Sequence, residues 1–256
     1  MGIFDGILIC SDFDGTLFYN GEISSSDINS IKYFQENGGL FTVCSGRGLS
    51  FIKGHEDKVC PNTYSIVQNG SLIVDASSGE KLFECFIDAE AEIRALDILI
   101  HSDCFDYLMV YYPSGPKRIE ICEYDIERQG ILCNLHYGSM IVAKEEHMLP
   151  CSLALLANTE LSSLCLVKSW RLGLDIIPHD GGKGQAVKRV KDKVGARISV
   201  AVGDYDNDSD MLLSADISYA VGNASPKALT CAKRKTVCVW ENAITHIIEE
   251  LKNEAK

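Results

Sequence analysis

Short apolar runs alternate with amphipathic segments in the first quarter and in the last third of the chain. The apolar runs have the length of buried strands, and the amphipathic segments space their apolar residues as one face of a helix does. A regular alternation of this kind is typical of a parallel sheet with crossover helices. We therefore predict an α/β fold with a Rossmann-like, doubly wound parallel sheet. The predicted strands are 7–11, 40–44, 64–68, 198–202, 217–221 and 236–239, and the predicted helices are 26–37, 49–58, 184–193, 208–213 and 243–252.

The middle of the chain has a different pattern, with more extended segments and fewer clear crossover helices. This change predicts an inserted α+β domain at 85–177, which interrupts a discontinuous core domain formed by 1–84 and 178–256. Within the insertion, the pattern predicts a helix at 89–100 and strands at 107–112, 118–124, 152–157 and 172–177.

Composition limits the partners that this fold could bind. With 256 residues, 46% of them hydrophobic, the chain can bury one large core and a smaller companion domain. The formal net charge of −12 argues against nucleic acid, because no basic stripe is present to neutralise phosphates. An anionic substrate would therefore need local positive charge from a metal ion, from Lys or Arg, or from backbone N–H groups.

Other features of the sequence predict a cytoplasmic protein without a membrane partner. The longest apolar runs are far shorter than the roughly 20 residues that cross a bilayer, and no basic segment precedes an apolar stretch at the N-terminus. The eleven cysteines include no C-x-x-C pair, so we expect reduced thiols rather than a disulfide framework or a zinc site.

Four polar clusters lie where strands end or helices begin, at the edge where doubly wound sheets bind ligands. The first cluster is Asp12-Phe13-Asp14-Gly15-Thr16, directly after the first strand. Side chains two residues apart in extended backbone point the same way, so we expect Asp12 and Asp14 to converge on one spot. Two carboxylates suit Mg²⁺, and an ionised carboxylate can attack phosphorus. The alternative interpretation is a pair of Asx turns that closes the strand.

The second cluster is Ser45-Gly46-Arg47, after the strand 40–44. Ser45 could cap the following helix, and the same helix N-terminus could also hold a phosphate group. Arg47 could offer a planar donor fork to that phosphate, or it could form a surface ion pair.

The third cluster places Lys183 in a glycine-rich segment at the start of a helix. The helix dipole disfavours a lysine in the first turn, so its position is easier to explain if it faces an anion than if it is solvated. The segment is not a Walker A loop, because Gly184 stands where Ser or Thr must follow the lysine.

The fourth cluster is the acidic segment from Gly203 to Asp210, after the strand 198–202. It could be a solvated helix start, which favours Asp in its first turn. It is not an EF-hand loop beginning at Asp204, because Ser209 occupies the sixth position, where Gly is required. Packing so many like charges beside an apolar strand is costly unless a cation lies among them, and a metal ion would offset that cost.

Together and in this order, the four clusters resemble those of the haloacid dehalogenase superfamily, and within it the Cof-like phosphatases with a class IIB cap. The resemblance implies that Asp12 is the nucleophile and that Asp14 acts first as general acid and then as general base. It also implies a small phosphorylated metabolite as substrate, with a sugar phosphate as our expectation, and Mg²⁺ as cofactor. The residues that it assigns to Mg²⁺ are Asp12, Asp14 through its backbone carbonyl, Asp204 and Asp208, and those that it assigns to the phosphoryl group or substrate are Ser45, Gly46, Arg47, Lys183 and Asn207.

The inserted domain would be a lid that reads the leaving group. Its charged residues Lys117, Arg118, Glu120 and Glu123 are interpreted as surface charges, and no histidine is given a catalytic role. Two other functions stay open. One is a phosphomutase of the phosphomannomutase type, which would return the phosphoryl group to a sugar, and the other is a catalytically silent module that binds a phosphometabolite. The sequence does not indicate an oligomeric state.

Overall fold

The computed structural model describes residues 2–55, 58, 61–75 and 77–254. The chain divides into two compact units, which we call unit 1 (Met1–Phe83 with Lys183–Lys256) and unit 2 (Glu84–Gly182). The domain bounds expected from the sequence, 1–84, 85–177 and 178–256, stay predictions, and each unit is described by itself.

Unit 1 is built on a five-stranded parallel sheet in the order β13-β12-β11-β1-β2. The chain winds outward from β1 in one direction to β2 and in the other through β11, β12 and β13, so the strand order reverses next to β1. In such sheets the carboxyl ends of the strands at the reversal form the ligand-binding edge. The strands are β1 (Ile7–Ser11), β2 (Leu40–Val43), β11 (Ile198–Gly203), β12 (Ile217–Ala220) and β13 (Arg234–Lys235).

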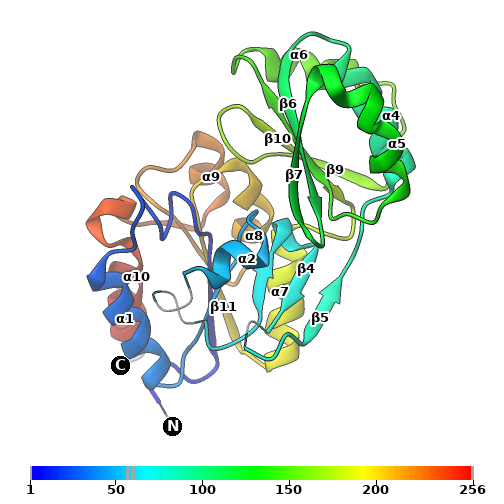
Figure 1. Cartoon of the computed structure of the whole chain (residues 1–256). Helices are drawn as coiled ribbons and strands as arrows, with labels where there is room; N and C mark the ends of the chain where they lie inside the picture. Colours follow the sequence, from blue (N-terminus) through cyan, green and yellow to red (C-terminus); the bar gives the residue numbers. More distant parts are fainter. Residues whose placement is uncertain (1, 56–57, 59–60, 76, 255–256) are drawn as a thin grey trace. The chain divides into compact units, whose positions relative to one another are not determined.

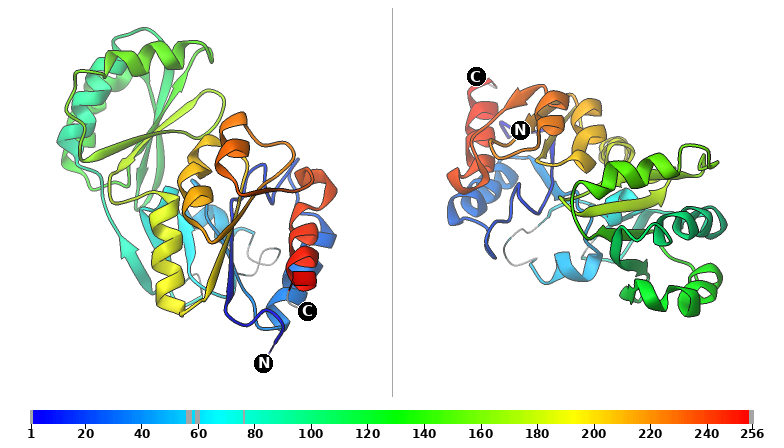
Figure 2. Two further views of the ribbon diagram at one scale, coloured as in Figure 1. Left: turned by 180° about the vertical axis from the view of Figure 1, so that it is seen from behind. Right: turned by 90° about the horizontal axis from the view of Figure 1, so that it is seen from above.

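Helices cover both faces of this sheet, which confirms the predicted α/β class (Figures 1 and 2). On one side α1 and α10 lie together, and the Thr245 amide donates to Oδ1 of Asp27 across the pair. On the other side, apolar residues of α7 and α8 share a core with Leu8 and Ala201 of the sheet. The helices of unit 1 are α1 (Ser25–Glu36), α2 (Leu49–Lys53), α7 (Lys183–Val194), α8 (Ser209–Ser214), α9 (Pro226–Cys231) and α10 (Ala243–Glu254).

A small antiparallel arrangement follows β2 in unit 1. It consists of β3 (Ser65–Val67), β4 (Leu72–Val74) and β5 (Lys81–Glu84), with a 3₁₀ turn at Gln68–Gly70 between the first two. A parallel bridge between Cys44 and Ile66 connects β3 to the end of β2. This bridge brings the Gln68–Gly70 turn to the segment that follows β2.

Unit 2 is a five-stranded sheet in the order β7-β6-β8-β10-β9, with antiparallel neighbours throughout. Its helices pack on one face of this sheet, where alternate strand residues such as Leu108, Ile141 and Ile176 form the core. The elements are α4 (Ala89–Ile100), β6 (Phe105–Tyr112), β7 (Gly115–Glu120), α5 (Tyr124–Cys133), β8 (Ser139–Ala143), α6 (Met148–Leu155), β9 (Leu164–Lys168) and β10 (Gly173–Pro178).

Three of the predicted elements differ from the structure. The predicted strand 152–157 is wrong, because this stretch belongs largely to helix α6, and a short apolar run has no period that distinguishes a strand from a helix. The predicted strand 118–124 ends at Glu120, where a 3₁₀ turn leads into α5. The predicted strand 236–239 is replaced by β13 and a 3₁₀ turn at Val239–Glu241.

Two other expectations involve residues that lie outside the described ranges. The helix expected at 49–58 is α2 at Leu49–Lys53, and residues 56, 57, 59 and 60 lie outside the described residues. The cysteines that the structure describes are free thiols, whereas Cys60 lies outside it. Over the described ranges, no helix is both long enough and apolar enough to cross a membrane.

Candidate active site

The loop after β1 brings Asp12 to the carboxyl edge of the parallel sheet. The Asp12 amide still donates to the carbonyl of Val202 at 2.8 Å, so the residue continues the ladder between β1 and β11. Gly15 then turns the chain with φ +84°, and a Cβ at this position would lie 2.5 Å from Oδ2 of Asp204. Glycine is therefore required both for the turn and for the close approach of the two loops.

Lys183 is the first residue of α7 and points into the sheet edge. Its Nζ lies 2.6 Å from Oδ1 of Asp12 and 2.6 Å from Oδ1 of Asp208, and its side chain is fully buried. Burial alone lowers the pKa of Lys183, but the attraction of the two carboxylates outweighs it and raises the pKa well above its usual value. Lys183 therefore stays charged, and the expectation that it faces an anion corresponds to these two carboxylates.

Asp12, Asp204 and Asp208 form a cluster in which one carboxylate oxygen of each lies within 4.8 Å of the others. Burial and repulsion from Asp208 raise the pKa of Asp12 well above its usual value, although Lys183 lowers it. The same two causes raise the pKa of Asp204 to about 7. Three carboxylates thus lie around one ammonium group, which contacts two of them, and when all three are ionised their negative charge exceeds what that group neutralises.

The donor set fits a divalent cation with oxygen ligands. Asp208 is largely committed, because its Oδ1 binds Lys183 and its Oδ2 accepts from the amides of Asp204 and Tyr205. Asp12 and Asp204 are therefore the carboxylates best placed to turn an oxygen toward a metal ion. The hydroxyl of Thr16 donates to Oδ1 of Asp204 at 3.0 Å and fixes the orientation of that carboxylate.

Asp14 does not belong to this cluster, which corrects the expectation that Asp12 and Asp14 converge on one spot. The carboxylate of Asp14 forms a two-pronged ion pair with Arg47, at 2.9 Å to Nε and 3.1 Å to Nη2. The contact with Arg47 gives the Asp14 carboxylate a partner outside the cluster. Both side chains of this pair are about half exposed, at 53% for Arg47 and 42% for Asp14, so the pair adds little stability and can open readily.

Ser45 follows β2 and is buried, with its amide donating to the carbonyl of Ile66 at 2.9 Å. Its hydroxyl accepts from the amide of Arg47 at 3.0 Å. It does not cap α2, because the residue at the N-cap of that helix is Gly48. The simple capping interpretation of Ser45 is therefore wrong, and the hydroxyl lies in a tight turn at Ser45–Arg47.

Three polar residues for which the sequence predicted no role connect these loops, and they are Asn69, Asn223 and Thr16. The Asn207 amide group donates to Oδ1 of Asn69 at 3.3 Å. The Asn223 amide group donates to the carbonyl of Gly15 at 2.8 Å, and its Oδ1 accepts from the Val239 amide. Thr16 is the third. The sequence signals at the two asparagines are the turn Asn69-Gly70 and the segment Gly222-Asn223-Ala224, which resemble the same superfamily but indicate no role.

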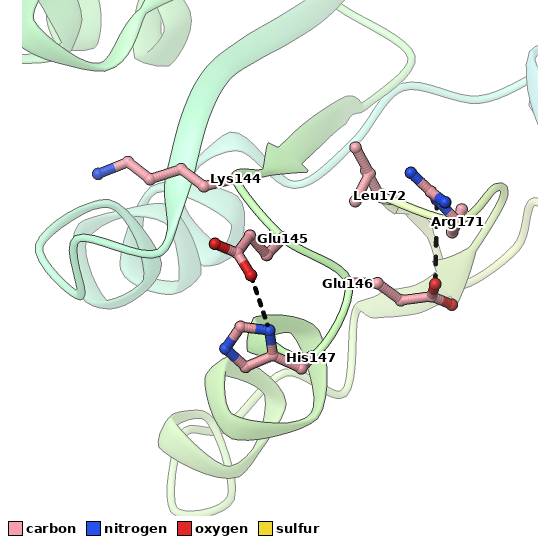
Figure 3. A pocket seen from close by; sticks show the side chains of 6 residues that line it. All are labelled: Lys144, Glu145, Glu146, His147, Arg171 and Leu172. Carbon is pink, nitrogen blue, oxygen red and sulfur yellow. Dashed lines mark ion pairs between the residues drawn. The ribbon is translucent and has the colours of Figure 1, made fainter.

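Unit 2 contains a separate surface hollow, lined by Lys144, Glu145, Glu146, His147, Arg171 and Leu172 (Figure 3). Its charged side chains are already paired, as in the ion pair of His147 with Glu145 and that of Arg171 with Glu146. Unit 2 also holds exposed ion pairs of Lys117 with Glu127 and of Arg118 with Glu120, as expected for surface charges.

Comparison with known proteins identifies the family. The sequence model of the haloacid dehalogenase-like hydrolases matches residues 9–248. The chain therefore belongs to this family, which confirms the predicted recognition and the prediction of a hydrolytic enzyme.

Relatives of known name and structure agree over almost the whole chain. Phosphatase YwpJ of Bacillus subtilis is 23% identical over 288 residues, which cover 95% of this chain and 99% of the relative. The phosphoglycolate phosphatase of Staphylothermus marinus is 23% identical over 253 residues, with coverage of 95% and 97%. Among solved structures, a haloacid dehalogenase-like hydrolase from B. subtilis is 22% identical with a TM-score of 0.79, and covers 95% of this chain and 99% of its own. The subclass IIB sugar phosphatase BT4131 is 16% identical with a TM-score of 0.78, with coverage of 95% and 98%. These two likenesses show the fold.

Proposed function

We propose that the protein is a Mg²⁺-dependent phosphatase that hydrolyses phosphate monoesters of small metabolites through an aspartyl-phosphate on Asp12. The observation that carries the proposal is the buried contact of Asp12 with Lys183 beside the acidic cluster of Asp204 and Asp208. An ammonium group held against a carboxylate is suited to a nucleophile that must meet an anionic phosphoryl group, because it offsets the repulsion between them.

The residues divide the work as follows. Asp12 attacks phosphorus, and Lys183 and the Ser45 hydroxyl balance the charge on the transferring group. Asp12 and Asp204 would hold Mg²⁺, supported by Asp208, and the bound ion would supply further charge neutralisation and orientation of the phosphoryl oxygens. Asp208 binds Lys183 and two backbone amides of its own loop, so it fixes the position of the ammonium group relative to that loop.

Asp14 acts as general acid and then as general base in this proposal. It protonates the leaving alkoxide and afterwards takes a proton from the water that cleaves the aspartyl-phosphate. To do so it must leave Arg47, and the exposed position of their ion pair makes that exchange inexpensive. The Arg47 guanidinium, which also lies over the ring of Phe51, could then bind an anionic group of the substrate.

The substrate class rests on the relatives. One is named a phosphoglycolate phosphatase, and one structural neighbour is a sugar phosphatase. From these two relatives we infer that the substrate is a small phosphorylated metabolite, and sugar phosphates are the first compounds to test.

The test is Mg²⁺-dependent phosphate release from a panel of sugar phosphates, nucleotides and cofactor phosphates. Asp12→Asn removes the nucleophile, and Asp192→Asn is the matched control because Asp192 is an exposed carboxylate on α7. Release that disappears with EDTA and in Asp12→Asn, but persists in Asp192→Asn, supports the proposal. If the wild type releases nothing even from an activated aryl phosphate, the proposal is wrong, and activity that appears only with a sugar bisphosphate primer would identify a mutase.

A further inference from the structure

Two consecutive residues between β3 and β4 adopt the left-handed backbone conformation, although neither is glycine. Gln68 has φ 52° and Asn69 has φ 50°, and both are buried. Residues with side chains adopt this region infrequently, and such conformations persist only where surrounding contacts enforce them. Here the enforcing contacts lead to the Ser45–Arg47 turn, because the amide of Gln68 donates to the carbonyl of Arg47 and the amide of Asn69 to that of Ser45, both at 3.0 Å.

The side chain of Asn69 lies directly against Gly46. A Cβ added to Gly46 would lie 3.1 Å from Oδ1 and 3.2 Å from Nδ2 of Asn69, which is tighter than an ordinary van der Waals contact. Gly46, the middle residue of the predicted phosphate-binding turn, therefore packs on the Asn69 amide group. This contact explains why the position is occupied by glycine.

The same amide group reaches the acidic loop. Oδ1 of Asn69 accepts from Nδ2 of Asn207 at 3.3 Å, and Asn69 is only 4% exposed. Asn207 lies next to Asp208, which binds Lys183. The buried side chain of Asn69 thus contacts two segments of the site. One is the turn proposed to bind the phosphoryl group, and the other is the loop that contains the proposed metal ligands and the partner of Lys183, Asp208.

We infer that Asn69 is a positioning residue that sets the distance between the Ser45–Arg47 turn and the Asp204–Asp208 loop. The inference rests on the proposed phosphatase function. The backbone contacts of the turn would be made equally well by glycine, which adopts positive φ without strain. The side chain is therefore not needed for the conformation of the turn, whereas its contacts with Gly46 and Asn207 connect the turn to the acidic loop.

The experiment compares Asn69→Gly with Gln68→Gly in the full-length protein. Both variants relieve a left-handed residue and keep its backbone amide, but Gln68 contacts Gly48 rather than Gly46 and Asn207. We expect Asn69→Gly to lower kcat/KM about 10- to 100-fold, as loss of a supporting contact behind a metal or phosphate site typically does. It should also weaken inhibition by inorganic phosphate by a similar factor, while its melting temperature matches or exceeds that of the wild type. Gln68→Gly should retain kcat/KM within about twofold.

A double variant tests whether Asn69 acts through its contact with Asn207. If Asn69 acts through Asn207 as well as through Gly46, then Asn69→Gly lowers kcat/KM by a markedly smaller factor in an Asn207→Ala background than in the wild type. Asn69→Asp, which tolerates the left-handed conformation, provides a second folded variant and should also weaken inhibition by phosphate. The inference is overturned if wild type is active and Asn69→Gly and Asn69→Asp both match Gln68→Gly. Failure of the proposed function is a separate result, because wild type itself would then release no phosphate.

Discussion

The buried ammonium group of Lys183 offers the sharpest test of the electrostatics of the site. Replacing it with methionine keeps the length of the side chain and removes the charge that Asp12 and Asp208 share. Removal of one partner from a buried ion pair costs about 3–5 kcal/mol, because the remaining charge stays buried without compensation. For a chain of this size, 1 kcal/mol shifts the melting temperature by roughly 2–4 °C, so Lys183→Met should melt on the order of 10 °C below the wild type at pH 7.5.

The pH dependence of this loss has a definite sign. The pKa values of Asp12 and Asp204 are already raised by burial, and Lys183 lowers both of them. Without the lysine these pKa values rise further, so the folded state holds protons that the unfolded state releases. A carboxyl with a raised folded pKa contributes stability below its unfolded pKa, near 4, and loses it as the pH rises through the folded value. The deficit of Lys183→Met should therefore be small at pH 5 and grow toward pH 8.

The assay is thermal unfolding at pH 5, 6, 7 and 8 without added divalent metal. Lys188→Met serves as the control because Lys188 is exposed on the same helix. Equal melting temperatures for Lys183→Met and Lys188→Met at pH 7.5, or a deficit that shrinks as the pH rises, would refute the reasoning.

Three further predictions use other contacts. Gly15→Ala should cost about 1–2 kcal/mol for its left-handed backbone and lower activity further, since the methyl group displaces the Asp204 carboxylate, and melting and kcat/KM measure the two effects. In unit 2, the buried His136 directs its ring nitrogens to Glu92 and to the Asn134 carbonyl. Burial opposes its charge, but Glu92 raises the pKa, so the stabilisation is complete below about pH 6.5 and lost as the pH rises through the folded pKa. Hydrogen exchange of unit 2 amides should accelerate across that rise in the wild type, and His136→Gln should remove the dependence. Ser24→Ala, which deletes the N-cap of α1, should cost about 1 kcal/mol of unfolding free energy in a urea titration, and an unchanged midpoint would contradict that.

The parallel sheet was predictable because its strands are buried on both faces and read as continuous apolar runs. Strand 7–11 was predicted with the bounds that the structure has, and strand 198–202 is one residue short of β11. Unit 2 was harder, because its strands β6 and β7 mix buried and exposed residues and do not read as continuous apolar runs. The helix α5 was missed entirely, since only a 3₁₀ turn separates it from β7 and it contains Gly130 among polar residues.

The sequence indicated which residues lie near the candidate site. It did not indicate how their side chains are arranged. Asp12, Lys183, Asp204 and Asp208 come together as a cluster because each follows a strand or begins a helix at one edge of the sheet. The position of Asp14 was not predictable, because its carboxylate pairs with Arg47, which is 33 residues away in the sequence. Asn69 was not identified because its role depends on a side-chain contact with Gly46 that no local pattern encodes.

The central strand of unit 1 has a consequence for how the protein forms. β1 lies between β2 and β11, and Ile7 pairs with Ile198, so the innermost pairing joins the beginning of the chain to a segment made near its end. During synthesis β1 can pair early with β2, but its other edge stays unpaired until the β11 segment has been translated, whereas unit 2 is continuous and can fold earlier. The unit in the middle of the sequence can therefore fold first, and the parallel sheet that carries the proposed site residues is completed last.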